Sequence, residues 1–282
     1  MTATGLWADG DAYERWIGRW SRPVAVDFLA WLDQPAGLRW LDLGSGTGAL
    51  TETILATAAP ASVAGVEPSA AFVAHARERV PDSRASFLEG AAGALPVDSG
   101  SVDMAVAGLV LNFVPDLAAG LAELRRVVVP GGTIAGYVWD YAGRMEIIRR
   151  FFDAAIELDP AAVAADEGSR FPICAPGPLG AAFEDAGLAE VEVRPIEVPT
   201  TFTNFDDYWT PFLSGIAPAP AYAMRLSEAE RGRLRERLRA TLPTEDDGSI
   251  HLVARAWAVR GRTDGPGRGP GTPPGVAPDP AP

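Results

Sequence analysis

Three glycines that alternate with small polar residues form the stretch of the sequence most able to do chemistry. Gly44, Gly46 and Gly48 directly follow the mostly apolar segment Trp40–Leu43. Because glycine has no Cβ, such a loop lets backbone N–H groups approach a ligand closely. About 20 residues further on, Glu67 ends a second apolar segment, where an acid accepts hydrogen bonds from two ribose hydroxyls. The loop and the acid together predict a nucleoside-containing ligand at the C-terminal edge of a parallel sheet.

Short apolar segments alternate with helical patterns from residue 39 onward. We predict strands over 39–43, 62–66, 85–89, 102–107 and 133–139, with helices over 47–58, 69–79 and 117–128 between them. Beyond residue 140 the expected elements are helices over 144–157, 178–186, 205–213 and 227–241 and strands over 188–198 and 249–259. Strictly alternating strands and helices imply an α/β fold, in which helices cover both faces of a parallel sheet.

The composition suggests four stretches of chain. Residues 1–37 read as a helical lead-in or lid, and residues 38–140 as the ligand-binding core. Residues 141–260 are expected to hold further lid insertions and the C-terminal half of the sheet. Glycine and proline dominate from residue 261, so 261–282 is predicted to be a disordered tail.

The charge balance and the rare residue types exclude several classes of function. A net charge of −13 argues against a nucleic-acid partner. All the basic residues are arginine, which rules out a lysine Schiff base and a P-loop lysine. One cysteine and two histidines give no metal-binding spacing, so no metal is expected. Without a signal peptide or an apolar run of about 18 residues, the expected protein is soluble and cytoplasmic, with no membrane contact. The oligomeric state is not readable from the sequence.

The chain resembles the class I S-adenosylmethionine-dependent methyltransferases, in particular the small-molecule branch related to ubiquinone/menaquinone-biosynthesis methyltransferases. The motifs that carry the resemblance are Leu41–Gly48 (LDLGSGTG), Val66–Ser69 (VEPS), Gly90–Pro96 (GAAGALP) and Leu121–Gly132 (LAELRRVVVPGG). It covers residues 38–140 well and 10–37 and 141–260 loosely. It implies a Rossmann-like, seven-stranded methyltransferase sheet of order 3-2-1-4-5-7-6 with the last strand antiparallel.

The resemblance implies S-adenosylmethionine as cofactor and S-adenosylhomocysteine as product. The residues that it assigns to cofactor binding are Tyr13, Arg19, Gly44, Ser45, Gly46, Gly48, Glu67, Pro68, Ala91, Ala92, Gly108 and Leu109. Arg19 would pair with the methionine carboxylate. Ala91 stands where the family usually has an aspartate that accepts from the adenine amino group, which leaves only the backbone N–H groups of Ala91 and Ala92 for the adenine ring.

The acceptor is expected to be a small molecule in a space bounded by Asn112, Trp139, Tyr208 and Trp209. Asn112 stands where relatives often carry histidine, and it either faces the substrate or caps the next helix turn. An aromatic, partly acidic cap suits a planar or apolar acceptor.

Methyl transfer by in-line SN2 displacement depends mainly on positioning, so the sequence needs no obvious acid–base pair. The methylated atom, whether O, N or C, is not readable. If the acceptor requires a general base, the weak candidates are Asp140, Tyr141 and Asp206.

Two other classes of function stay open. Gly44-x-Gly46-x-x-Ala49 also satisfies the permissive dinucleotide fingerprint of NAD(P)-dependent oxidoreductases, although the second half of the chain does not repeat a βαβαβ unit. A non-methylating or scaffold protein with a methyltransferase fold is the third possibility, because Ala91 departs from the family pattern and no base is evident.

Overall fold

A seven-stranded sheet runs through the computed structural model, which describes residues 18–215 and 217–265. Its strands are β1 (Arg39–Leu43), β2 (Ser62–Glu67), β3 (Ala85–Glu89), β4 (Val102–Gly108), β5 (Val128–Trp139), β6 (Ala189–Phe202) and β7 (Ile250–Arg262). The strand order is β3-β2-β1-β4-β5-β7-β6, and β7 is antiparallel to both of its neighbours. The predicted fold class and strand order are therefore confirmed.

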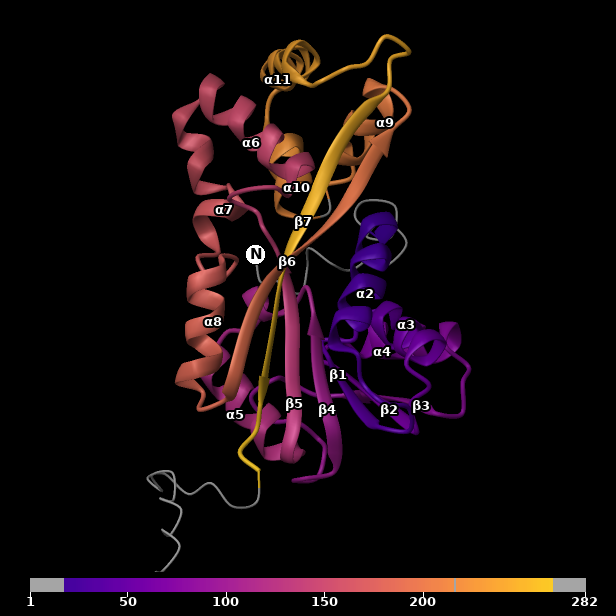
Figure 1. The fold of residues 1–282 in the computed structure, drawn as a ribbon. Helices are drawn as coiled ribbons and strands as arrows, with labels where there is room; N and C mark the ends of the chain where they lie inside the picture. The colour runs from indigo at the N-terminus through magenta and orange to yellow at the C-terminus, as the bar shows by residue number, and fades with distance from the viewer. Residues whose placement is uncertain (1–17, 216, 266–282) are drawn as a thin grey trace, which may run out of the picture.

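Helices cover both sides of this sheet. On one side lie α2 (Arg19–Leu32), α3 (Ala49–Thr57) and α4 (Ala70–Arg79), and on the other lie α5 (Leu117–Val127) and α8 (Pro176–Asp185) (Figure 1). The helix starts follow local capping, since the Ser69 hydroxyl accepts the Phe72 N–H at α4 and the Asp116 carboxylate accepts the Ala119 N–H at α5. The parallel strands thus all end at one edge, where their loops meet.

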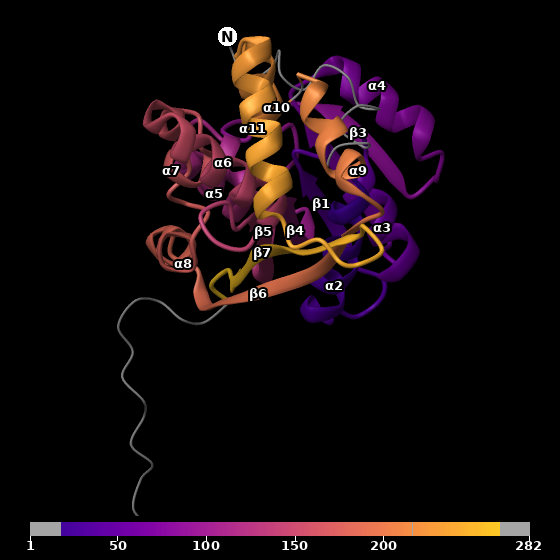
Figure 2. The same cartoon turned by 90° about the horizontal axis from the view of Figure 1, so that it is seen from above.

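A helical lobe stands above that edge (Figures 1 and 2). It contains α6 (Glu146–Leu158), α7 (Glu167–Arg170), α9 (Phe205–Trp209), α10 (Pro218–Arg225) and α11 (Glu228–Thr241), with short 3₁₀ turns at Pro160–Ala164 and Thr210–Leu213. The far ends of β6 and β7 continue past the end of β5 and support the lobe. One continuous hydrophobic core joins the lobe to the sheet.

Most predicted elements are present, with differences that have physical reasons. β5 begins at Val128 rather than at 133, because Val128 already pairs with Val102 and the Pro130–Gly132 stretch forms an irregularity within the strand. α10, which contains Pro218 and Pro220 in its first turn, was not predicted from the sequence. A proline in the first turn of a helix removes no hydrogen bond, so these positions are compatible with a helix.

The C-terminal boundary of the sheet also lies later than expected. β7 runs to Arg262, and the Thr263 hydroxyl donates to the Val129 carbonyl at 2.8 Å. Residues 261–263 therefore belong with the sheet and not with a tail. The expectations for residues 1–17, including Tyr13, and for 266–282 lie outside the described residues. No helix in the described ranges is long and apolar enough to cross a membrane.

Candidate cofactor and acceptor site

The loop after β1 has the backbone that only glycine adopts without strain. Gly44, Gly46 and Gly48 have φ angles of +67°, +52° and +86°. A Cβ on Gly44 would lie 2.5 Å from Cγ2 of Val110, so this position must be glycine for the fold itself. A Cβ on Gly46 would have no neighbour within 4 Å, so only its positive φ, and no packing contact in the described protein, favours glycine there. The open approach to Gly46 fits a loop that receives a ligand.

Glu67 reaches back from the end of β2 to this loop. Its carboxylate accepts the N–H of Gly46 at 3.1 Å and the N–H of Ser69 at 3.0 Å. Burial raises the pKa of Glu67, and the two backbone N–H groups oppose that rise. Two carboxylate oxygens offer about four acceptor positions, so capacity remains for a pair of ligand hydroxyls. The predicted juxtaposition of the glycine loop and the acid is present in the structure.

Asp42 is a buried acid within this site to which the sequence analysis gave no role. Its carboxyl lies in β1 beneath the loop and accepts the Thr51 hydroxyl of α3 at 2.7 Å. Burial raises its pKa to about 7, and the nearby Glu67 charge adds to the rise. Asp42 therefore ties the strand to the helix on the two sides of the glycine loop.

The raised pKa of Asp42 predicts a pH-dependent stability. Folding favours the protonated acid, so this stabilisation is complete below the unfolded pKa and is lost as pH rises through about 7. Asp42→Asn removes the titration while the Thr51 hydroxyl can still bond to the amide. We expect the variant to gain stability relative to the wild type between pH 4.5 and pH 8, by about 1.4 kcal/mol for each unit of pKa shift. Thermal unfolding across this range measures the difference, and parallel curves for the two proteins would contradict the prediction.

The loop after β3 is fixed by α5. Its Ala94 N–H donates to the Ala91 carbonyl at 3.0 Å, which closes a tight turn. Glu123 accepts the Leu95 N–H at 2.8 Å, and Arg126 donates to the Leu95 carbonyl at 3.0 Å. The Arg126 guanidinium holds the pKa of Glu123 at about 2. The Leu121–Gly132 motif thus places the turn that carries Ala91, a role that its sequence alone did not reveal.

Loss of the Glu123 carboxylate should loosen this turn. Glu123→Ala leaves the Leu95 N–H without its acceptor, and a net hydrogen bond is worth about 0.5–1.5 kcal/mol. We expect a melting temperature lower by a few degrees and a several-fold weaker affinity for S-adenosylhomocysteine, measured by calorimetry. Glu157→Ala is the control, because Glu157 pairs with Arg237 at 2.6 Å on the helical lobe. Equal affinities for both variants would show that the contacts of Glu123 and Arg126 with Leu95 do not position the site.

The loop after β4 carries further predicted site residues. Gly108 ends the strand, and Leu109 has a φ of +59° with its N–H bonded to the Tyr137 carbonyl at 2.8 Å. Asp116, and not Asn112, caps α5. Within the described residues, the buried Nδ2 of Asn112 and Oγ of Ser45 have no hydrogen-bond partner. Buried polar atoms without partners are rare in proteins and mark places where a ligand or a water can bind.

Three aromatic residues that were expected to face the acceptor lie in the core instead. Tyr208 is fully buried, and its hydroxyl donates to the Ile147 carbonyl at 2.9 Å. Trp209 is buried in the same aromatic cluster, with its ring 6.1 Å from Phe212. Trp139 is buried in β5. The structure corrects the assignment of all three residues to the acceptor, because Tyr208 and Trp209 pack within the lobe and Trp139 is buried in the sheet.

The three candidate bases also make contacts within the protein. Asp206 lies on the surface and pairs with Arg235 at 3.0 Å, so the structure corrects its assignment as a base. Asp140 accepts the Arg144 N–H at 2.9 Å and lies 3.5 Å from the Arg255 guanidinium. It fixes the turn after β5, a structural role that replaces the expected catalytic one. Tyr141 is buried, with its ring 6.1 Å from that of Phe171.

Arg19 is already paired with a carboxylate of the protein. Its guanidinium pairs with Asp207 at 3.1 Å and lies over the rings of Trp20 and Phe202. Arg19 was expected to bind the methionine carboxylate, but in the structure its ion pair with Asp207 joins α2 to the lobe.

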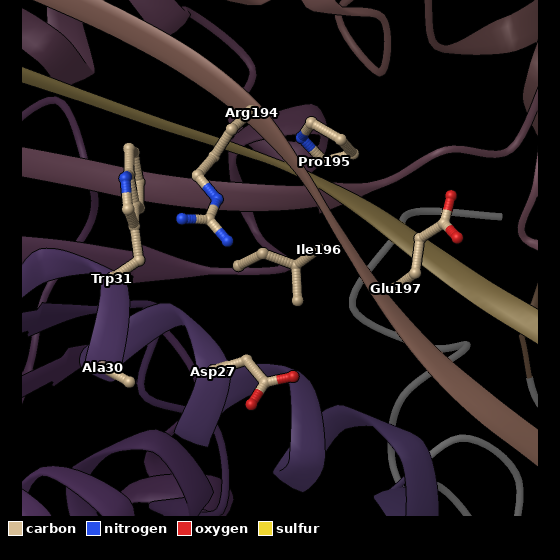
Figure 3. A pocket seen from close by; sticks show the side chains of 7 residues that line it. All are labelled: Asp27, Ala30, Trp31, Arg194, Pro195, Ile196 and Glu197. Atoms are coloured by element: carbon tan, nitrogen blue, oxygen red, sulfur yellow. The ribbon is translucent and has the colours of Figure 1, made fainter.

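A separate groove of about 400 Å³ lies between α2 and β6. Figure 3 shows Arg194 and Ile196 of β6 facing Trp31 and Asp27 of α2. The Arg194 guanidinium lies 5.5 Å from the centre of the Trp31 ring. No residue predicted for the site lines this groove.

Comparisons with known proteins identify the family. Residues 41–136 match the methyltransferase domain family. A ubiquinone/menaquinone biosynthesis C-methyltransferase from Methylobacterium nodulans is 32% identical over 173 residues, which are 55% of this chain and 68% of that protein. The chain belongs to the class I S-adenosylmethionine-dependent methyltransferase family.

Two further comparisons show how far the likeness extends. A trans-aconitate 2-methyltransferase from Variovorax paradoxus is 35% identical over 123 residues, 44% of this chain and 46% of that protein. The chain thus spans about half the length of that relative. A crystal structure of a methyltransferase-like protein from Bacillus halodurans has a TM-score of 0.57 and 13% identity, and covers 85% of this chain and 98% of that one. At this identity the structural likeness shows the fold alone.

Proposed function

We propose that this chain transfers a methyl group from S-adenosylmethionine to a small-molecule acceptor. The observation that carries the proposal is the contact between Glu67 and the glycine loop at the edge of the parallel strands. A carboxylate at the end of the second strand, beside a loop with an open approach at Gly46, has the donors and acceptors that an adenosyl group needs.

The residues present fit this cofactor. When bound, it supplies a methyl group on a sulfonium, which leaves as a neutral sulfide. Glu67 binds the ribose hydroxyls with its remaining lone pairs, and the unpartnered Ser45 hydroxyl offers a hydrogen bond from the loop. Pro68 follows Glu67 at the start of the next turn. Ala91 and Ala92 present backbone N–H groups, and Gly108 and Leu109 complete the wall after β4.

Catalysis then rests on positioning. Asp140 and Asp206 are held in ion pairs, so neither is a free base in the described structure. An acceptor held in line with the methyl carbon needs no oxyanion stabilisation, because the leaving group carries no charge. The net charge of −13 supports a small molecule rather than a nucleic acid as acceptor. We also propose a cytoplasmic location, which the single, buried free cysteine supports.

A thermal-shift comparison tests the choice of cofactor. S-adenosylhomocysteine at saturation should raise the melting temperature by several degrees, because a ligand that binds only the folded state stabilises it. NAD⁺ should leave it unchanged, since β7 is antiparallel and the described residues form no second parallel half that could bind a dinucleotide. A shift with NAD⁺ alone would favour the oxidoreductase.

Turnover separates an enzyme from a scaffold with the same fold. Radiolabelled S-adenosylmethionine, incubated with a broad panel of acceptors, should yield labelled product and S-adenosylhomocysteine in equal amounts. Tight cofactor binding without any transfer would favour the non-methylating protein.

A further inference from the structure

The groove between α2 and β6 is a concave site separate from the glycine loop. Its volume of about 400 Å³ lies within the range of about 300–1,000 Å³ that is typical of small-molecule sites. Its lining residues all differ from those around the glycine loop and Glu67. The lining combines an aromatic ring, an aliphatic side chain and charged groups, as expected of a site that binds a small polar molecule.

Trp31 and Arg194 form one wall of this groove. The Arg194 guanidinium lies 5.5 Å from the centre of the Trp31 ring, and that of Arg260 lies 4.6 Å from it. Arg260 is fixed by other contacts, because it donates to the Trp31 carbonyl at 3.3 Å and pairs with Glu192 at 2.6 Å. Arg194 forms no hydrogen bond or ion pair with another described residue. A guanidinium that stacks by its face on a ring keeps its N–H groups available to an anion.

The two acids that line the groove differ in their partners. Glu197 accepts from Arg255 at 2.7 Å and from Arg144 at 2.9 Å, and these two guanidinium groups lower its pKa. The protein therefore already neutralises the charge of Glu197. Asp27 lies one turn before Trp31 on the same face of α2, and its carboxylate has no partner within the part of the chain that the structure describes. Asp27 is thus available to a cationic group.

An aliphatic surface separates the two unpaired charges. Figure 3 shows the Ile196 side chain between the Arg194 guanidinium and the Asp27 carboxylate. Ile196 is buried, whereas both charged residues are exposed and do not pair with each other. A cation and an anion on the two sides of an apolar floor match a ligand that carries both charges at a distance from one another.

We propose that this groove binds a small zwitterion with a carboxylate at one end, an ammonium group at the other and an apolar or aromatic middle. Arg194 donates to the carboxylate, for which its planar guanidinium offers two parallel N–H groups, and Asp27 accepts from the ammonium group. The middle of the ligand lies on Ile196, beside the Trp31 ring. The inference goes beyond the proposed function, because the groove is distinct from the site of the cofactor and the acceptor.

NMR titration with three probes that share one ring tests the charge pattern. The readout is the indole N–H signal of Trp31, assigned by its loss in Trp31→Phe, so that only binding in the groove is followed. 4-(Aminomethyl)benzoate carries both charges, 4-methylbenzoate only the carboxylate, and 4-methylbenzylamine only the ammonium group. We expect the zwitterion to bind about three- to tenfold more tightly than the other two, as ion pairs of good geometry at an exposed site contribute. No binding of the zwitterion, or equal binding of either other probe, would overturn the proposal.

Two variants test the two ends of the groove separately. Arg194→Gln should bind the zwitterion no better than 4-methylbenzylamine, and Asp27→Asn should bind it no better than 4-methylbenzoate. Both residues are exposed, so the fold should be retained. The controls are Arg235→Gln, since Arg235 also lies over a ring (Phe205, at 5.7 Å) but on the lobe, and Asp185→Asn, an exposed acid on α8. A groove variant that keeps the full preference of the wild type would refute the proposal.

S-adenosylhomocysteine distinguishes this groove from the cofactor site. At saturation it should leave the affinity for 4-(aminomethyl)benzoate unchanged, and Arg194→Gln and Asp27→Asn should bind it as the wild type does. If it competes with the zwitterion for the groove, the groove belongs to cofactor binding and the present inference is wrong. If the wild type binds the zwitterion in the groove but does not bind S-adenosylhomocysteine, the proposed function is wrong and the present inference holds.

Discussion

Glu67→Ala is expected to weaken the affinity for S-adenosylmethionine about 100-fold, because hydrogen bonds donated to a charged acceptor contribute about 1.5–3 kcal/mol each. The variant loses the acceptor for two ribose hydroxyls and also frees the N–H groups of Gly46 and Ser69. The fold should survive, since burial already raises the pKa of Glu67 and its charge is not favourable to stability. Calorimetric titration measures the change.

Two further variants make this result specific. Glu67→Gln keeps one acceptor oxygen and should lose about tenfold, between the wild type and the alanine variant. Glu78→Ala removes an exposed acid on α4 and should bind like the wild type. Unchanged affinity in Glu67→Ala would mean that the cofactor does not reach the end of β2.

The glycine loop gives the second large expected effect. Gly46→Ala introduces a methyl group with no protein neighbour within 4 Å, so the chain should fold with about 1–2 kcal/mol of backbone strain from the positive φ. The methyl group projects into the approach to the loop. Cofactor affinity should therefore fall at least about tenfold, as expected when close backbone contact with a ligand is blocked.

Gly44→Ala and Gly37→Ala are the comparison variants for this prediction, one with a steric clash and one with backbone strain alone. At Gly44 the new Cβ would lie 2.5 Å from Val110, so that variant should lose stability as well as affinity. Gly37 also has a positive φ, +83°, and an open surrounding, but it lies before β1. Its alanine variant should show the same strain and normal affinity. Melting temperature and calorimetric affinity together distinguish the three, and equal affinity in the Gly46 and Gly37 variants would contradict a ligand at the loop.

The sheet could be predicted from the sequence because each strand and each motif is recognisable within a short stretch of the chain. Each parallel strand is a mostly apolar run. The spacing of Gly44, Gly46, Gly48 and Glu67 is typical of a loop and an acid that bind a nucleoside. The predicted contact between the loop and the acid is found at 3.1 Å. Asp42 and Glu123 were missed as positioning residues because their partners, Thr51 and Leu95, are fixed by packing of α3 and α5 on the sheet.

The lobe was harder to predict because residues of the same type, close together in the sequence, face either the core or the solvent, and the sequence does not show which. Tyr208 and Trp209 looked suited to a binding wall, but the direction of α9 turns both rings into the core. Asp206, in the same short helix, turns outward to Arg235.

A crystal structure with bound S-adenosylhomocysteine would show directly whether the adenosyl group lies at the ends of β1 and β2. We expect the ribose oxygens within hydrogen-bonding distance of the Glu67 carboxylate and the amino-acid part against Gly44–Gly48. Density for the ligand in the groove between α2 and β6, beside Trp31 and Arg194, with the Glu67 edge empty, would contradict it.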